Sequence, residues 1–332
     1  FLAAAKRADG AYALHGLDTD GATLFQLPLP GRGHAAAAHP RRPEAVAFAR
    51  RPGRFALVVD CAEGRETARL ARPEGRVFAG HGAFSPDGAL LFTTENAYEA
   101  GEGRLGVWDA VAGYARLGEV PTQGVGPHEV ILAPEGDALI VANGGILTHP
   151  DSGRAKLNLA TMRPTLARIA LDGAHVATVE ARPALRRNSL RHLAARADGL
   201  IACAAQWEGD LRQAPPLLAL WRPGADRLDW RAAPQPVQRR TRGYAGSVAV
   251  SDDGRRIAYT APRGGIALLF EGADAAFAGT IERADICGVA AAEDALLFTD
   301  GGGGRIRLDG AQTRPARAAQ SAVSWDNHLV SI

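Results

Sequence analysis

The sequence is poor in cysteine, in lysine and in long apolar runs. Its three cysteines are Cys61, Cys203 and Cys287, and no two of them form a CxxC pair. This argues against a zinc knuckle and against thioredoxin-like chemistry. No apolar stretch approaches the roughly 20 residues that a membrane-spanning helix needs. We therefore expect neither a redox motif nor a membrane span.

Lysine is nearly absent, since Lys6 and Lys156 are the only two, and arginine supplies almost all positive charge. The 38 basic and 36 acidic residues nearly cancel. The arginine pairs are scattered and are not interleaved with aromatic side chains as a nucleic-acid groove would be. We expect no nucleic-acid partner. The chain begins at Phe1 rather than Met, and removal of an export signal is one natural reason.

Sustained 3.6-residue periodicity is also lacking, and a four-part strand pattern takes its place. The first part of this pattern is clearest in HGAFSPDG (81–88), EVILAPEG (129–136), HLAARADG (192–199) and SVAVSDDG (247–254), with looser copies at 35–42, 287–294 and 320–327. Two strands rich in Val, Ile, Leu and Phe and a fourth strand follow each copy except the last. The repeats start about 47 residues apart on average, which is typical of four-stranded propeller blades rather than helical repeats.

Seven copies predict one all-β domain over residues 1–332, a seven-bladed β-propeller with four-stranded blades of the WD40 or YVTN kind. Residues 318–332 supply one strand and residues 1–30 supply three. Joining them closes the ring and removes exposed sheet edges. The third and fourth repeats run long, which places insertions near 144–165 and 208–216. A closed ring has no edge that demands a second copy, so we expect a monomer.

In a propeller the first strand of each blade lines the central channel, so first-strand starts and second-strand ends should meet at one mouth. The first-strand starts are His34, His81, His128 with Glu129, Arg191 with His192, Ser247, Cys287 and Gln320. The second-strand ends are Lys6 with Arg7, Arg50, Glu95 with Asn96, Asn143, Gln206 with Glu208, Arg263 and Asp300. Four of the nine histidines thus fall at equivalent repeat positions, which is the most specific chemical signal in the chain.

This pattern leaves two interpretations open. In the first, His34, His81, His128, Glu129 and His192 are metal ligands, because neutral imidazoles with a carboxylate suit Zn, Fe or Cu; haem is a further candidate. The other candidate ligand-binding residues lie at the mouth or in the first insertion: Glu95, Asn96, Asn143, His149, Arg154, Lys156, Gln206, Glu208 and Asp300. In the second interpretation these polar groups satisfy one another and ordered water in a wet channel.

Several segments resemble one bacterial family through essentially the whole chain. They are RGH (32–34), HGAFSPDGALLFTTEN (81–96), GVGPHE (124–129), VANGGILTHPDSGRAKLNL (141–159), LRH (190–192) and AQWEG (205–209). They resemble the domain-of-unknown-function family 1513. This resemblance implies an exported, periplasmic protein with a removed signal, commonly of the twin-arginine type. It also implies a link to iron or other metal acquisition, with an imelysin-like or di-haem peroxidase-like protein as partner.

Three functions remain open. The favoured one is a periplasmic, non-catalytic binding or accessory protein that holds a metal, haem or metal chelate at the channel mouth. A metal-dependent, lactonase-like hydrolase is the second, with Glu95, Asn143 and Asp300 on the metal; the histidine-rich ring departs from that pattern. The third is a protein–protein interaction scaffold. No Ser or Cys stands beside a base in the sequence, so we name no catalytic residue; we favour a non-catalytic role and leave the question of an enzyme open.

Overall fold

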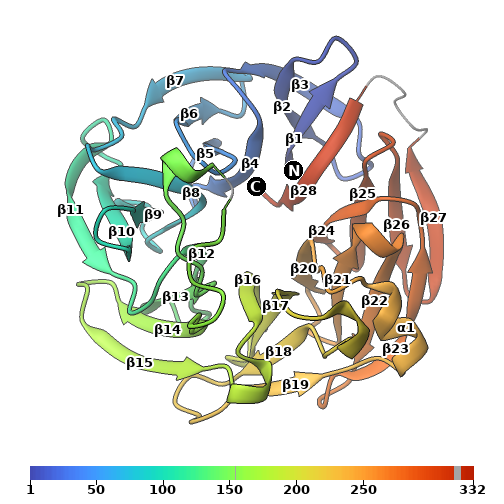
Figure 1. Ribbon diagram of the computed structural model, residues 1–332. Helices are drawn as coiled ribbons and strands as arrows, with labels where there is room; N and C mark the ends of the chain where they lie inside the picture. Colours follow the sequence, from blue (N-terminus) through green and yellow to red (C-terminus); the bar gives the residue numbers. More distant parts are fainter. Residues whose placement is uncertain (154, 318–322) are drawn as a thin grey trace.

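The computed structural model describes residues 1–153, 155–317 and 323–332. Seven four-stranded antiparallel sheets form a ring around a central channel (Figure 1). The all-β, seven-bladed propeller predicted from the repeat is therefore confirmed. Across the described residues, no helix combines the length and apolar character needed to cross a membrane.

Each blade runs from an inner strand at the channel to an outer strand at the rim. The inner strands are β4 (Gly33–Ala38), β8 (Arg76–Phe84), β12 (Pro127–Leu132), β16 (Asn188–Ala195), β20 (Ser247–Val250), β24 (Ile286–Ala292) and β28 (Val323–Val330). The second strands are β1 (Leu2–Arg7), β5 (Glu44–Ala49), β9 (Leu90–Ala97), β13 (Ala138–Asn143), β17 (Ile201–Trp207), β21 (Arg256–Ala261) and β25 (Ala295–Asp300).

The third strands are β2 (Tyr12–Leu17), β6 (Ala56–Asp60), β10 (Glu102–Asp109), β14 (Thr165–Ala170), β18 (Leu218–Trp221), β22 (Ile266–Glu271) and β26 (Arg305–Asp309). The outer strands are β3 (Thr23–Leu29), β7 (Arg65–Arg69), β11 (Ala115–Pro121), β15 (His175–Glu180), β19 (Asp229–Arg231), β23 (Ala276–Glu282) and β27 (Gln312–Arg317). The helical turns are η1 (Pro150–Ser152), η2 (Pro183–Leu185), η3 (Leu211–Gln213), α1 (Gln235–Arg240) and η4 (Pro262–Gly264).

The ring closes as predicted, with one C-terminal strand joined to three N-terminal strands. The order in this blade is β28-β1-β2-β3, and Val330 pairs with Leu2. Both chain ends therefore lie beside the channel (Figure 1). Closure places β28 next to β24 on one side and β4 on the other. A side chain of β28 that points into the channel therefore lies beside side chains of β4, although the two strands are far apart in the sequence.

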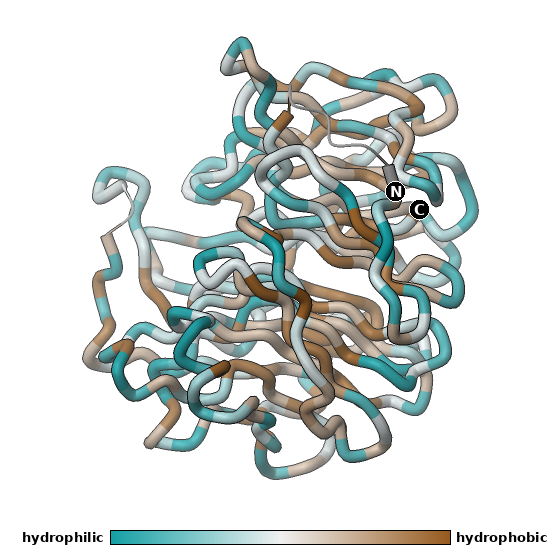
Figure 2. Tube along the Cα trace, turned by 90° about the vertical axis from the view of Figure 1, so that its right-hand side faces the viewer, coloured by the Kyte–Doolittle hydropathy of each residue, from teal (hydrophilic) through white to brown (hydrophobic). Residues whose placement is uncertain are grey.

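The core fills the space between neighbouring blades. Its buried side chains come mainly from second and third strands, for example Trp221 and Cys203 in one cluster and Tyr259 and Phe270 in the next. These strands are buried on both faces, so their sequences are nearly continuous apolar runs. Outer strands such as β11 alternate between exposed and half-buried residues instead. Figure 2 shows the same division, with apolar segments inside the blades and hydrophilic loops outside.

One buried histidine lies away from the channel, inside the closure blade. His15 of β2 is 0% exposed, and its ring lies 5.0 Å from that of Trp325 at an interplanar angle of 78°. Neither ring nitrogen has a hydrogen-bond partner among the described residues. Burial, followed by the charges of Arg305 and Arg7, lowers the pKa of His15 to about 4. The native fold therefore holds this imidazole neutral.

We expect His15 to make the protein less stable in mild acid. An unfolded chain takes up the proton near pH 6.5, whereas the native state does so only near pH 4. Because the unfolded state binds the proton first, this contribution is present above pH 6.5 and is lost as the pH falls toward 4. The loss amounts to about 3 kcal/mol. Urea unfolding of wild type and His15→Phe across this range checks it: the difference between their unfolding free energies should change with pH, and a constant difference would contradict it.

Candidate metal centre in the central channel

Bulges at the channel end of the inner strands determine which side chains reach the channel. Six of the seven inner strands have a register shift at this level against their second strands. In β12 the shift falls between Pro127 and Glu129, and in β16 between Leu190 and His192. A bulge sets two residues opposite one and re-aims a side chain. As a result His128 and Glu129 both line the channel.

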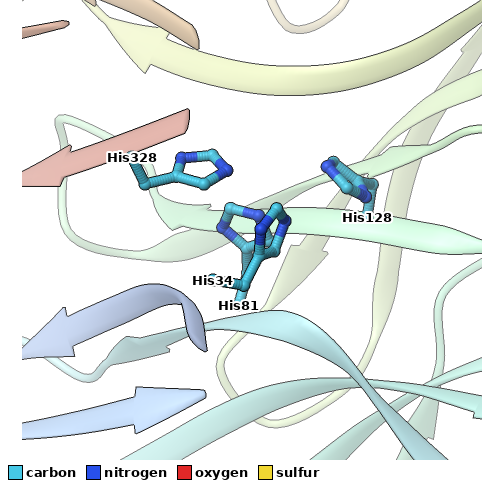
Figure 3. A group of neighbouring side chains, drawn as sticks. All are labelled: His34, His81, His128 and His328. Atoms are coloured by element: carbon cyan, nitrogen blue, oxygen red, sulfur yellow. The ribbon is translucent and has the colours of Figure 1, made fainter. Parts of the chain in front are cut away.

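Five imidazoles meet in the channel, each from a different blade. They belong to His34 of β4, His81 of β8, His128 of β12, His192 of β16 and His328 of β28. Neighbouring ring centroids lie 4.4–6.1 Å apart. Figure 3 shows four of the rings gathered around one space. In this group one nitrogen each of His34, His81, His128 and His328 lies within 4.8 Å of the others.

A carboxylate adjoins the imidazoles. Glu129 Oε1 lies 3.5 Å from His81 Nδ1, and Glu129 Oε2 lies 3.5 Å from His192 Nδ1. Glu129 Oε2 also accepts a hydrogen bond of 3.0 Å from the backbone N–H of Leu193. Ligand atoms of His81, Glu129 and His192 form a second group within 4.8 Å. The two groups share His81, so the channel holds one continuous set of six donor side chains.

Many of these nitrogens have no protein partner. The atoms without a hydrogen bond among the described residues are His34 Nδ1, His81 Nε2, His128 Nε2, both nitrogens of His192, and His328 Nε2. Buried polar atoms are normally hydrogen-bonded, and leaving one unpaired costs about 1–3 kcal/mol. A concentration of unpaired nitrogens in one buried place therefore indicates that the protein alone does not complete this site.

The protonation states suit metal binding. Burial, followed by the charge of neighbouring imidazoles, lowers the pKa of His34, His128 and His328 well below the usual histidine value. Burial also lowers the pKa of His192, against the opposing effect of Glu129. Burial alone would raise the pKa of Glu129, but interactions with His81 and His192 outweigh it and lower this pKa. Neutral imidazoles and an ionised carboxylate are the forms that bind metal.

The spacing of the four imidazoles fits one ion after a small contraction. Bonds of about 2.0–2.1 Å from zinc to nitrogen set ligand atoms about 3.3 Å apart in a tetrahedron. The four nitrogens lie within 4.8 Å of one another. Inward movement of each ring by about 1 Å therefore suffices, which small side-chain rotations supply. A mainly imidazole set suits Cu, Zn, Ni or Fe rather than Mg or Ca.

The histidine set separates two cavities of different character. The cavity at the predicted mouth has a volume of about 210 Å³ and is lined by His34, Arg50, Arg51, Ala79, His128, Lys156, Arg191, His192, Gln206, Glu208, Tyr244, Arg263 and Asn327. The cavity on the other side has a volume of about 460 Å³ and is lined mainly by small inner-strand residues, with His81, Glu129, His192 and His328 at its end. The histidine set thus adjoins a polar, cationic cavity on one side and an alanine-rich cavity on the other.

Three of the other candidate ligand-binding residues line this mouth cavity. They are Lys156, Gln206 and Glu208. Lys156 forms an ion pair with Glu208, which ties the first insertion to the end of β17. Gln206 Nε2 donates to the carbonyl oxygen of Ala245 at 3.1 Å. Arg154, which precedes Lys156 by two residues in the sequence, lies outside the described residues.

The structure does not bring Glu95, Asn143 and Asp300 to the mouth, so the lactonase-like ligand set is not assembled. Glu95 lies inside its blade, where both carboxylate oxygens accept hydrogen bonds from Arg116. Asn143 Nδ2 donates to the Thr122 carbonyl oxygen at 2.8 Å. Arg283 Nε donates to Asp300 at 2.6 Å. The physical reason is strand alternation: these residues lie at or near the ends of second strands, but their side chains point into the blades and pair there.

Asn96 and His149 fasten the first insertion instead of lining the mouth cavity. Asn96 Nδ2 donates to the Thr148 carbonyl oxygen at 3.1 Å. The ring of His149 lies 5.0 Å from that of Tyr98, and its Nε2 lies 3.4 Å from Glu99 Oε1. Both residues therefore hold the insertion against the end of β9.

His328 is the site residue that the sequence interpretation missed. The repeat pattern predicts that the last first strand starts at Gln320, which lies outside the described residues. In the structure His328 lies at the bulge of β28, directly before Leu329, which pairs with Ala3, and its ring lies 4.4–4.7 Å from those of His34, His81 and His192. A signal was present: the C-terminal NHLVSI resembles RHLAAR at 191–196.

Comparisons with known proteins name a family but no activity. A search of curated proteins finds no match to the chain. The family model described as "Protein of unknown function (DUF1513)" matches residues 27–332, nearly the whole length. The chain therefore belongs to the DUF1513 family, as its sequence motifs predicted.

Proposed function

We propose that the protein binds a divalent transition metal in the channel and serves as a periplasmic, non-catalytic binding or accessory protein in iron or other metal acquisition. One observation carries the metal site: nitrogens of four imidazoles from four blades lie within 4.8 Å of one another. His34, His81, His128 and His328 would hold the ion. Glu129 and His192, directly beside them, would balance part of its charge.

The number of donors favours binding over catalysis. A catalytic zinc site usually has three protein ligands and an open position for water or substrate. Here five imidazoles and one carboxylate surround the same space. Such a set can enclose an ion completely, which suits storage or transfer.

The tight ring spacing argues for a bare ion and against haem. The centroids of neighbouring rings are only 4.4–6.1 Å apart. No slot for a porphyrin remains among rings at this spacing. For nitrogen ligands, affinity rises from Fe²⁺ through Co²⁺ and Ni²⁺ to Cu²⁺. The ion carried in the cell would therefore depend on which metal is supplied as well as on affinity.

Export and a partner belong to the same proposal. The family resemblance implies a periplasmic location and an imelysin-like or di-haem partner protein. Cysteine chemistry is compatible with an oxidising compartment: Cys203 and Cys287 are buried free thiols, and burial raises the pKa of both. Reaction of a thiol requires its thiolate, so these two side chains resist oxidation.

Metal analysis with matched histidine variants tests the proposal. Protein purified without an affinity tag is dialysed against Cu²⁺, Zn²⁺ or Fe²⁺ and its metal content is measured by elemental analysis. We expect about one ion per chain in wild type and almost none in His81→Asn/His328→Asn. His149→Asn/His175→Asn is the control, because it removes two histidines outside the channel. Wild type that takes up no metal, or equal uptake in both double variants, would overturn the proposal.

A further inference from the structure

The mouth cavity carries more positive charge than its acidic residues neutralise. Arg32 and Arg50 share one carboxylate, that of Asp326, at 2.5 and 2.6 Å. Lys156 is paired with Glu208. Arg191 and Arg263 have no ion pair with any residue of the described parts of the chain. Glu208 is the only acidic residue among the described residues that line the cavity, and Lys156 already pairs with it, so one carboxylate offsets the charge of several cations.

Arg191 is the stronger indication of a missing ligand. Arg191 is only 7% exposed, and its Nε has no hydrogen-bond partner among the described residues. Burial lowers the pKa of its guanidinium, yet arginine stays protonated in proteins. A buried, unpaired charge costs several kcal/mol, so positions of this kind are rare unless something else supplies the counter-charge. The bulge in β16 places this arginine beside His192.

Arg263 is held over the same cavity by an aromatic ring. Its guanidinium lies 4.3 Å from the ring centroid of Tyr244. The Tyr244 hydroxyl oxygen accepts a hydrogen bond of 2.9 Å from Asn327 Nδ2, and Asn327 directly precedes His328. Stacking orients the guanidinium and leaves its N–H donors free for a ligand. This contact sequence also connects the arginine to the metal-binding histidines.

We propose that the mouth cavity is an anion site that binds a small dicarboxylate between Arg191 and Arg263. A guanidinium presents a planar pair of N–H donors that matches the two oxygens of a carboxylate, so two arginines select a ligand with two such groups. The cavity volume of about 210 Å³ accommodates a four-carbon dicarboxylate. His34, His128 and His192 form the floor of the cavity, so a bound carboxylate lies next to the metal ligands.

This position couples the two sites, a step that rests on the proposed metal binding. A divalent ion among the histidines adds positive charge beside Arg191, and a dianion in the cavity offsets both. Each ligand therefore increases the affinity of the other by the same factor. The natural cargo is then a metal ion accompanied by an organic carboxylate.

Calorimetric titration of metal-free protein with succinate tests the anion site on its own. Succinate is a dicarboxylate of suitable size, and succinamide is its uncharged counterpart. We expect succinate to bind and succinamide not to bind. Arg191→Met and Arg263→Gln should each weaken succinate binding about ten- to hundredfold, since each removes a charged hydrogen-bonding partner. Arg227→Gln, an exposed arginine in the β18–β19 turn, is the control and should leave binding unchanged.

The outcomes separate this inference from the proposed function. Absence of succinate binding, binding by both variants as tight as by wild type, or tighter binding of inorganic phosphate than of succinate would overturn the dicarboxylate site. If Arg191→Met folds poorly, the succinate affinity of Arg263→Gln alone still decides between the two outcomes. A second titration, of Zn²⁺ with and without saturating succinate, should show tighter metal binding in wild type and no such gain in Arg263→Gln. Succinate binding without any metal binding would sink the proposed function and leave the anion site intact.

Discussion

Saturating Zn²⁺ is expected to raise the thermal unfolding temperature of the protein, and EDTA to reverse the rise. The four imidazoles whose nitrogens lie within 4.8 Å of one another belong to β4, β8, β12 and β28, so one ion would tie four blades together. One of these blades is the closure blade, in which β28 pairs with the N-terminal strand β1. An ion that binds only the native site stabilises it by about 4 kcal/mol when its free concentration is a thousand times its dissociation constant.

Differential scanning calorimetry with matched variants checks this expectation. His81→Asn/His328→Asn removes two ligands from different blades and should lose the Zn²⁺-dependent rise. His149→Asn/His175→Asn should keep it, because both side chains lie outside the channel. Retention of the rise in the first variant would contradict the expectation. So would bound Zn²⁺, measured by dialysis, that leaves the unfolding temperature of wild type unchanged.

The propeller could be predicted because each copy of the repeat contains a turn that is stabilised by hydrogen bonds between residues close in the sequence. In the turn 85–88, the Gly88 N–H donates to the Ser85 carbonyl oxygen, and Ser85 Oγ donates to Asp87. Gly88 has a φ of 77°, which favours glycine. The turn 251–254 repeats these contacts with Ser251, Asp253 and Gly254. Four consecutive residues determine each such turn, so the copies remain recognisable in a single sequence.

The direction of individual side chains could not be predicted in the same way. Glu95 and its neighbour Thr94 both lie in the last half of β9, but only Thr94 points inward, where its hydroxyl donates to the His81 carbonyl oxygen at 3.1 Å. Glu95 points into the blade because Arg116 of β11 and Thr93 bind its carboxylate there. This pairing depends on a strand 21 residues away in the sequence. A rule based on strand ends alone cannot distinguish the two neighbours.

His328 was missed for a related reason. The closure blade is divided between the two ends of the chain, so the turn that marks the first strand of other repeats is absent from it. Without that turn, the repeat pattern predicts Gln320 at the channel, eight residues before the histidine that lies there, His328. The bulges in β12 and β16 direct His128 and Arg191 toward the channel, and the sequence pattern does not reveal where these bulges lie. The site could thus be predicted in outline, with one of its five histidines missing.

Replacing Arg116 by Met is expected to lower the free energy of unfolding by about 3–5 kcal/mol, because it leaves a buried carboxylate without its partner. Glu95 is 0% exposed, and Arg116 Nη1 and Nη2 donate to its two oxygens at 2.8 and 3.0 Å. The guanidinium also stacks 5.0 Å from the ring centroid of Trp108, whose Nε1 donates to Thr93. Urea unfolding measures the loss.

The double variant Glu95→Gln/Arg116→Met separates the charge from the packing. It removes the buried carboxylate together with its partner, so it should recover part of the stability that Arg116→Met loses. Equal stability of the single and double variants would show that the lost stacking on Trp108 accounts for the whole effect. Metal uptake provides the decisive comparison for the site: Arg116→Met that remains folded should bind as much Zn²⁺ as wild type. Loss of metal in this variant would contradict the placement of Glu95 inside the blade, away from the channel histidines.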